Sequence, residues 1–361
     1  MKQSPLHERH LARNAKMADF GGWLMPIEYP GAGVLAEHAA VRERVGLFDV
    51  SHLGKASVVG EGALEFLNSM LTNDLTKISD GAAQYSMLCN SVGYVIDDLI
   101  VYRNSDTDFF IVPNASNTTA VVADLQANAP AAITVTNLHN EYGVIALQGP
   151  LAAKVLTHFG LQIEIDYMAF TYVSIAGCDV IVCRTGYTGE YGFEVLPKWN
   201  QALTVWDALV EQVEASDGLV CGLGARDTLR TEMGYPLHGH ELSLSISPVM
   251  ASASWAVGWN KAKFQGREVL NNQKEYGVAR RLVALKSLDR GIPRPDMQVL
   301  HEGNEVGIVT SGTFSPSLKC GIALALVNSD FTVGQQLELD VRGRSSSVEI
   351  VKLPFMPSHV R

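Results

Sequence analysis

The sequence predicts an α+β protein in which two related α+β halves are followed by a small all-β barrel. Residues 53 to 130 follow the order strand, helix, two paired strands, strand, helix, which resembles a split βαβ layer. Residues 140 to 215 repeat the order strand, helix, paired strands, helix. After residue 275 the chain changes to short apolar strands separated by Gly, Pro and Asp turns, which is typical of a small barrel.

The composition is that of a globular protein with a large core. The chain has 361 residues, of which 47% are hydrophobic, so two or three domains are expected. The charged fraction of 18% argues against disorder. A net charge of -10 disfavours nucleic acid and anionic membranes as partners. No apolar run reaches the length of a membrane span, and the N-terminus carries no signal pattern.

The five cysteines are scattered and include no CxxC pair. This pattern predicts free thiols in a reducing compartment rather than a disulfide framework or a structural zinc site. We therefore expect a cytoplasmic protein.

The first 52 residues combine helical spacing with glycine-rich loops. Helices are predicted at 7–16 and 34–45, a strand at 48–52, and loops at 19–26 and 31–33. His52 is a candidate acid–base group, although a single histidine beside a strand is more often hydrogen-bonded to backbone.

Residues 53 to 130 supply the next elements. Strands are predicted at 55–59, 84–90, 95–102 and 109–112, and helices at 62–71 and 119–126.

The strand from Val95 to Tyr102 places two carboxylates among apolar neighbours. Side chains alternate across a strand, so Asp97 and Asp98 must point to opposite faces. A carboxylate in apolar surroundings is costly to ionise unless a positive or hydrogen-bonding group meets it. One interpretation is an exposed edge-strand Asp beside an Asp that caps a neighbouring backbone. The other is a carboxylate held in a dry pocket for a polar ligand.

The elements of the second half and of the barrel are predicted from the same strand and helix spacing. Strands are predicted at 141–147, 167–175 and 180–183, and a tight glycine loop then leads into a strand ending near 195. Helices are predicted at 151–159, 201–213 and 228–233, and another helix ends near 274. Barrel strands are predicted at 282–285, 305–310, 321–327, 336–341 and 347–351, with a domain boundary near 275.

Two features between residues 221 and 241 could indicate a nucleotide site or a metal site. The glycines before Arg226 and Asp227 lack both G-x-G-x-x-G and a Walker lysine, so a capped helix is favoured over a nucleotide site. His238 and His240 have no third ligand at a zinc-like spacing, so no metal is expected.

Five motifs in register resemble the T-protein family of the glycine cleavage system, which are tetrahydrofolate-dependent aminomethyltransferases. The resemblance covers essentially the whole chain, including the opening loop from Phe20 to Pro26. The motifs are Asp49-Val50-Ser51-His52, Val95 to Tyr102, Arg184 to Glu190, Gly222 to Asp227 and Thr310 to Pro316.

The resemblance implies a three-domain cloverleaf around a central folate channel. It has two ferredoxin-like, split βαβ domains and a C-terminal antiparallel barrel. The implied domains are 1–52 with 136–275, which binds folate, then 53–135, which carries the Asp98 strand, and 276–361, the barrel.

The implied reaction transfers the methylene carbon of an aminomethyl group to tetrahydrofolate. The donor is carried on the lipoyl arm of the H-protein, and the products are ammonia, 5,10-methylenetetrahydrofolate and dihydrolipoyl H-protein. P-protein and L-protein are the functional partners, and neither a metal nor a flavin is implied.

The resemblance also assigns site residues. Asp98 is the catalytic carboxylate, a choice that alternation alone leaves open, and Glu194 reads the pterin. The other cofactor-binding residues are Tyr187, Arg226, Tyr167, Tyr85, Tyr102, Asn114, Val112, Leu53 and, on a loose alignment, Arg361. Without the resemblance, Tyr187 and Tyr167 read as ordinary core tyrosines and Arg226 as a partner of Asp227 or Glu232.

Some residues depart from the family pattern, and other activities share the fold. Tyr94 replaces a glycine, Leu53 and Lys55 are unusual after Ser51-His52, and Lys319-Cys320 replaces a glycine-containing turn. The alternative function is a tetrahydrofolate-dependent demethylase, a methyltransferase of the same fold. A folate-binding iron–sulfur assembly relative is disfavoured because no cysteine lies in the loop around Tyr187.

Overall fold

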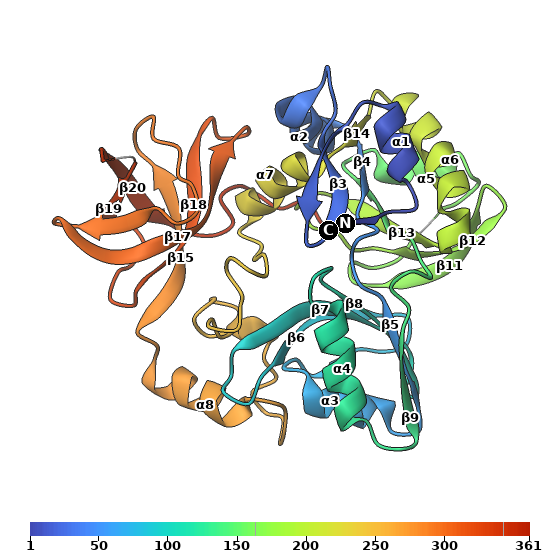
Figure 1. Ribbon diagram of the computed structural model, residues 1–361, viewed down its shortest axis with the longest axis horizontal. Coiled ribbons are helices and arrows are strands. Elements are labelled where there is room, and N and C mark those ends of the chain that lie inside the picture. Colours follow the sequence, from blue (N-terminus) through green and yellow to red (C-terminus); the bar gives the residue numbers. More distant parts are fainter. Residues whose placement is uncertain (163, 342) are drawn as a thin grey trace.

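The computed structural model describes residues 1–162, 164–341 and 343–361. The chain forms a six-stranded sheet with its helices, a five-stranded sheet with its helices, and a closed barrel. These three parts can be followed in Figure 1. Within the described ranges, no helix is both long and apolar enough to cross a membrane.

The five-stranded sheet has the order β6-β7-β8-β5-β9. Strands β8 and β9 are joined by α4 and run in the same direction on either side of antiparallel β5, which confirms the predicted split βαβ layer. Strand β6 is an additional edge strand. The elements are β5 (Ala56–Gly60), α3 (Ala63–Met70), β6 (Ala83–Cys89), β7 (Val95–Ser105), β8 (Asp108–Pro113), α4 (Thr118–Asn128) and β9 (Ile133–Asn137).

The six-stranded sheet repeats this organisation. Its order is β11-β12-β13-β10-β4-β14, so the strand–helix–three strands–helix–strand sequence recurs with β4 inserted beside β10. The repeated element order predicted from the sequence is confirmed. The elements are β4 (Gly46–Asp49), β10 (Ile145–Gln148), α5 (Ala152–Thr157), β11 (Phe170–Ile175), β12 (Cys178–Cys183), β13 (Gly192–Pro197), α6 (Ala202–Glu214) and β14 (Leu219–Cys221).

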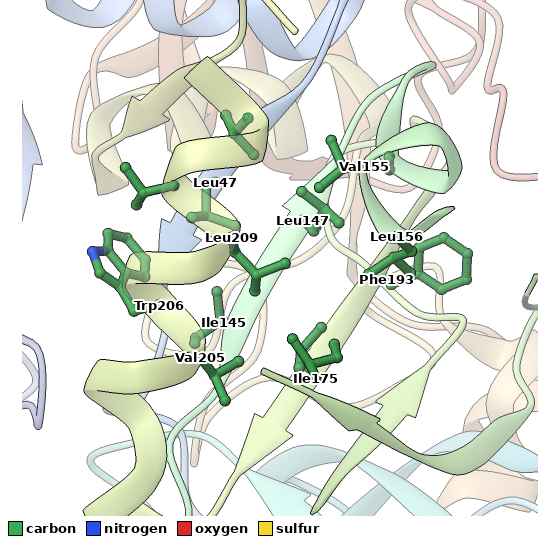
Figure 2. Packing of buried hydrophobic residues seen from close by; sticks show 14 of the residues in the cluster. Leu47, Ile145, Leu147, Val155, Leu156, Ile175, Phe193, Val205, Trp206 and Leu209 are labelled. Carbon is green, nitrogen blue, oxygen red and sulfur yellow. The ribbon is translucent and has the colours of Figure 1, made fainter. Parts of the chain in front are cut away.

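Helix α6 supplies much of the core on one face of this sheet. Trp206 and Leu209 are at most 1% exposed and pack with Leu147 and Phe193 of the sheet, as Figure 2 shows. The amphipathic spacing predicted for residues 201–213 is therefore confirmed, because its apolar stripe faces the strands.

The N-terminal segment differs from its prediction. The expected glycine-rich loop at 19–26 is a hairpin of β2 (Lys16–Phe20) and β3 (Trp23–Glu28), and the expected helix at 7–16 ends early, as α1 (His7–Ala12). Gly21 and Gly22 have φ angles of 60° and 85°, which a two-residue type I′ turn requires. The glycines therefore mark a hairpin turn rather than a loop. Strand β1 (Lys2–Gln3) joins β3 in parallel, and α2 (Gly33–Glu43) follows.

The C-terminal part is a closed barrel of antiparallel strands in the order β15-β18-β17-β16-β19-β20. The prediction of a small barrel is confirmed, and the four-residue strand β16 is the member that the sequence did not reveal. The strands are β15 (Arg280–Ser287), β16 (Gln298–His301), β17 (Asn304–Ser315), β18 (Cys320–Asn328), β19 (Gln336–Asp340) and β20 (Ser345–Val351). Helix α8 (Arg267–Tyr276) precedes the barrel, and short 3₁₀ turns lie at Leu75–Lys77, Trp199–Gln201 and Ser254–Ala256.

Helix α7 (Leu223–Met233) contacts both the barrel and the six-stranded part. Its Glu232 side chain is fully buried and accepts hydrogen bonds from Arg42 Nη2 at 2.8 Å and Ser315 Oγ at 2.5 Å. Arg230, also buried, pairs with Glu241 at 3.1 Å. The buried Glu232 therefore joins α7 to Arg42, which lies within residues 33–43, on one side and to the barrel strand β17 on the other.

Candidate active site

Ten of the residues predicted to form the site line a single cavity. They come from both sheets, from α7 and from the loop around residue 187, which are far apart in the chain. These residues are Leu53, Tyr85, Asp98, Tyr102, Val112, Asn114, Tyr167, Tyr187, Glu194 and Arg226. The remaining predicted residue, Arg361, is not part of the lining, but its guanidinium carbon lies 5.8 Å from the centre of the Tyr167 ring.

Asp98 lies on the cavity face of β7, as the alternation in the sequence requires for one of the two acids. Its Oδ2 accepts a hydrogen bond from the Tyr85 hydroxyl at 3.0 Å, and its Oδ1 accepts one from Asn114 Nδ2 at 2.8 Å. Burial raises the pKa of Asp98, and these two bonds oppose that rise. The carboxylate is thus held in a fixed orientation with its oxygens at the cavity.

Asp97 points to the opposite face and is fully buried. Its Oδ2 accepts the Asn114 backbone N–H at 2.9 Å, and its Oδ1 accepts the side-chain amides of Asn114 and Asn117. Burial, followed by the charge of Asp98, raises the pKa of Asp97. Asp97 is therefore the backbone-capping acid of the first interpretation, whereas Asp98 is not on an edge, because β7 lies between β6 and β8.

Glu194 is the second carboxylate in the cavity. It lies on β13 and accepts a hydrogen bond from Thr185 Oγ1 at 2.5 Å. Burial raises the pKa of Glu194, while the Thr185 bond and the charge of Arg226 oppose the rise. The hydroxyl of Thr185 is also 3.3 Å from that of Tyr102.

Arg226 lies in the cavity with its guanidinium carbon 4.4 Å from the centre of the Tyr187 ring. Asp227 pairs with Arg230, and Glu232 pairs with Arg42, so neither acid holds Arg226. Among the residues that the structure describes, no side-chain hydrogen bond or ion pair reaches this guanidinium. A half-buried cation stacked on an aromatic ring and otherwise unpaired is suited to an anionic or carbonyl ligand group.

His52 lies outside this cavity lining. It is 1% exposed, packs edge-on to Phe20, and its Nδ1 has no partner among the described residues. Burial lowers the pKa of His52 to about 3, so the ring is neutral at physiological pH. The structure therefore gives His52 a buried position that does not reach Asp98 by any hydrogen bond.

Two family domains match almost the whole chain. The GCVT N-terminal domain matches residues 6–261, and the glycine cleavage T-protein C-terminal barrel domain matches residues 280–356. The chain belongs to the glycine cleavage T-protein family.

Close relatives cover the full length of this T-protein family member. It is 56% identical over 362 residues to an aminomethyltransferase of Parafrankia sp., covering 100% of this chain and 99% of the relative. It is 55% identical to an aminomethyltransferase of Mycobacterium tuberculosis, covering 99% and 97%. The crystal structure of the glycine cleavage system aminomethyltransferase T from Bartonella henselae superposes with a TM-score of 0.93 at 34% identity, covering 99% of both chains.

The family fixes the class of enzyme. The protein is a transferase, an aminomethyltransferase of the glycine cleavage system. Its fold is the mixed α+β arrangement of T-proteins with an antiparallel C-terminal barrel. The resemblance inferred from five motifs is thereby confirmed.

Several residues of the cavity were missed by sequence reasoning. They include Thr185, which binds Glu194, and Trp255, whose ring stacks on Tyr85 with centroids 5.1 Å apart. Trp255 is 68% exposed. No local pattern in the sequence marks these side chains as near to Asp98, because only the packing of separate segments brings them there. The other missed lining residues are Leu99, Ile100, Met168, Gly186, Tyr235, Pro236 and Leu237.

One of two departures from the family pattern, Lys55, has a structural explanation, and the other, Tyr94, has none for its side chain. Lys55 is fully buried and donates hydrogen bonds to the Ser51 and Leu53 carbonyls at 2.9 and 2.7 Å, so it fixes the loop that carries Leu53. Burial lowers the pKa of Lys55 to about 7. Tyr94 closes the β6–β7 turn through its backbone bonds with Asn90. Nothing in the structure explains why a tyrosine side chain stands there.

Proposed function

We propose that the protein transfers the methylene carbon of an aminomethyl group on the lipoyl arm of the H-protein to tetrahydrofolate. The products are ammonia, 5,10-methylenetetrahydrofolate and dihydrolipoyl H-protein. The observation that carries the proposal is the shared cavity, which is lined by two carboxylates, Asp98 and Glu194, by aromatic rings, and by Arg226, which has no side-chain partner among the described residues.

The chemistry of the lining supports tetrahydrofolate as the acceptor. A carboxylate such as Glu194 can accept parallel hydrogen bonds from the 2-amino and ring N3 groups of a pterin. Tyr187 and Tyr167 offer flat surfaces for a bicyclic ring. Arg226 can hold a carbonyl or carboxylate of the same molecule. The residues present therefore fit this co-substrate.

Tetrahydrofolate, when bound, supplies the nucleophilic nitrogen that receives the carbon. Asp98 orients the reacting groups, because Tyr85 and Asn114 fix both of its oxygens. Its negative charge stabilises positive charge that develops beside it in a water-poor site. A proton can be held at Oδ of Asp98, because burial raises the pKa of this carboxyl above its usual range.

The same family membership supports the H-protein as the partner, with P-protein and L-protein acting in the same system. We also propose a cytoplasmic location. It is supported by the five cysteines, all of which are free thiols.

We further propose that the three parts are domains in a cloverleaf around a folate channel. Their bounds would be 1–52 with 136–275, 53–135, and 276–361. The separate hydrogen-bonded sheets and the lining of the cavity by residues from two of these parts support this division.

The test is a coupled assay with lipoylated H-protein, glycine decarboxylase and tetrahydrofolate that follows methylenetetrahydrofolate. Product is expected only when the H-protein carries its lipoyl group. If the complete mixture gives no product, and a sulfonium methyl donor transfers its methyl group to tetrahydrofolate and leaves as a thioether instead, the demethylase alternative holds.

Glu194→Ala is expected to weaken tetrahydrofolate binding by about 10- to 100-fold, the value of one or two charge-assisted hydrogen bonds. Isothermal titration calorimetry measures the change. Glu211→Ala removes an equal charge from the exposed face of α6 and serves as the control. Unchanged affinity in Glu194→Ala refutes the pterin-reading role.

Asp97→Asn is expected to lower turnover by less than Asp98→Asn does. The amide of an asparagine cannot accept all three N–H groups that Asp97 now accepts, so the loop at Asn114 loosens. The change therefore acts on the position of Asn114 rather than on the reacting groups. Steady-state kinetics with saturating substrates checks the order, and a turnover below that of Asp98→Asn contradicts it.

A further inference from the structure

Three consecutive backbone carbonyls, those of Ser51, His52 and Leu53, are each bound by a buried basic side chain. Lys55 Nζ donates to the Ser51 and Leu53 carbonyls at 2.9 and 2.7 Å, and His139 Nε2 lies 2.9 Å from the His52 carbonyl. Lys55 is fully buried and His139 is 6% exposed. A carbonyl only accepts, so Nε2 of His139 carries the hydrogen of its bond. The turn at residues 51–53 therefore has a side-chain donor at every residue.

The same turn supplies part of the cavity wall. Leu53 and Asn114 both line the cavity. Between them, the Gly54 N–H donates to the Pro113 carbonyl at 2.8 Å. A Cβ atom at Gly54 would lie 2.1 Å from Thr118 Oγ1, so only glycine allows the turn to approach the end of β8 this closely. The turn is thus packed against the segment that carries Asn114, and the bonds to its carbonyls set where Leu53 lies.

We propose that Lys55 is a positioning residue for tetrahydrofolate binding, which holds the 51–54 turn so that Leu53 stays in the cavity wall. Lys55 is not itself among the described residues that line the cavity, so it acts through Leu53. The proposal rests on the proposed function. It extends that function by assigning part of the affinity for tetrahydrofolate to a side chain outside the cavity.

Lys55 acts through its hydrogens rather than through its charge. Burial lowers the pKa of Lys55 to about 7, and the neutral amine still has two hydrogens for the two carbonyls. Methionine has a similar length and no donor. Lys55→Met therefore removes both bonds with little change in volume.

A second buried lysine makes the same kind of contact without a cavity residue. Lys261, which is 7% exposed, donates to the Leu71 and Asn73 carbonyls at 2.6 and 2.7 Å. None of residues 71–73 is among the described residues that line the cavity. Lys261→Met is therefore the matched control, because it leaves two carbonyls unpaired in the same way but does not release a wall residue.

The experiment measures the dissociation constant of tetrahydrofolate by calorimetry for the single variants and for the Lys55→Met, Leu53→Ala double variant. Leu53→Ala is expected to weaken binding by about 10-fold, the value of one apolar side chain at a ligand contact. Lys55→Met is expected to weaken it by about 5- to 10-fold, because the released turn no longer holds Leu53 in place. The double variant is expected to bind as Leu53→Ala does, because Lys55 then has no wall residue to position. Lys261→Met stays within about twofold of wild type.

Lys55→Gln tests whether a donor restores binding. Its amide keeps N–H groups but ends one atom short of the position of Nζ, so it is expected to bind more tightly than Lys55→Met and less tightly than wild type. If Lys55→Met does not fold, Lys55→Gln takes its place in the double-variant comparison.

A second readout uses the protein without ligand. Hydrogen exchange, followed by mass spectrometry on peptides that cover residues 50–56, reports the Leu53 and Gly54 N–H groups, which bond the Val50 and Pro113 carbonyls. Exchange in these peptides is expected to be faster in Lys55→Met than in wild type and unchanged in Lys261→Met.

The outcomes separate this proposal from the proposed function. Losses that add in the double variant, unchanged binding by Lys55→Met, or unchanged exchange at residues 50–56 overturn the positioning role of Lys55 and leave the proposed function in place. A wild-type protein that binds no tetrahydrofolate overturns the proposed function and this proposal together.

Discussion

Asp98→Asn is expected to lower kcat by about 10²- to 10⁴-fold, the range for loss of a general acid–base or a pre-organised charge. The carboxylate is the charged group that β7 presents to the cavity, and Tyr85 and Asn114 hold both of its oxygens. An asparagine retains the shape but cannot stabilise positive charge or exchange a proton. Steady-state turnover with saturating H-protein and tetrahydrofolate measures the loss.

The fold should survive this substitution. An asparagine at residue 98 can accept from the Asn114 amide with its oxygen and donate to the Tyr85 hydroxyl oxygen, so the side chain keeps both of its contacts at the cavity. Thermal unfolding close to that of wild type is the control. Near-normal turnover of Asp98→Asn under these conditions would contradict a catalytic role for Asp98, even though this residue lines the cavity.

Glu232→Ala is expected to lower the free energy of unfolding by about 3–5 kcal/mol, because several buried donors lose their acceptor and Arg42 keeps only Glu190 as a charged partner. Its carboxylate accepts from Arg42 and Ser315, and from the backbone N–H and hydroxyl of Ser317. Urea unfolding measures the loss. Glu268→Ala, at an exposed position of α8, should change stability by less than about 0.5 kcal/mol.

The contribution of Glu232 has a defined pH range. Burial raises its pKa, but the bonds from His38 and Ser315 and the charge of Arg42 outweigh burial and hold the pKa at about 2. A folded-state pKa below that of the unfolded chain contributes stability above about pH 4.5, and this is lost as the pH falls toward 2. The loss is worth about 3 kcal/mol. Equal acid sensitivity of Glu232→Ala and wild type contradicts this assignment.

Patterns that depend on neighbours in the chain predicted local structure well. The alternation along Val95 to Tyr102 placed the two acids on opposite faces before any fold was known, and the structure has them there. Helical spacing predicted α6, whose apolar stripe covers the six-stranded sheet. Very short strands such as β14 and β16 were not predicted, because three or four residues show too little periodicity to identify a strand. Such strands are held in place by their partner strands.

The sequence by itself determined the element order, the repeat of that order, the barrel and the family, because all four follow from local spacing and from motifs in register. Only the tertiary structure decided which residues meet. It brought Glu194, Arg226 and Asp98 into one cavity, where Arg226 has no side-chain partner among the described residues. It also directed Asp97 away from that cavity, to accept a hydrogen bond from the backbone N–H of Asn114. The physical reason is that burial, pairing and charge at a site depend on contacts between segments far apart in the chain, and neither composition nor periodicity encodes those contacts.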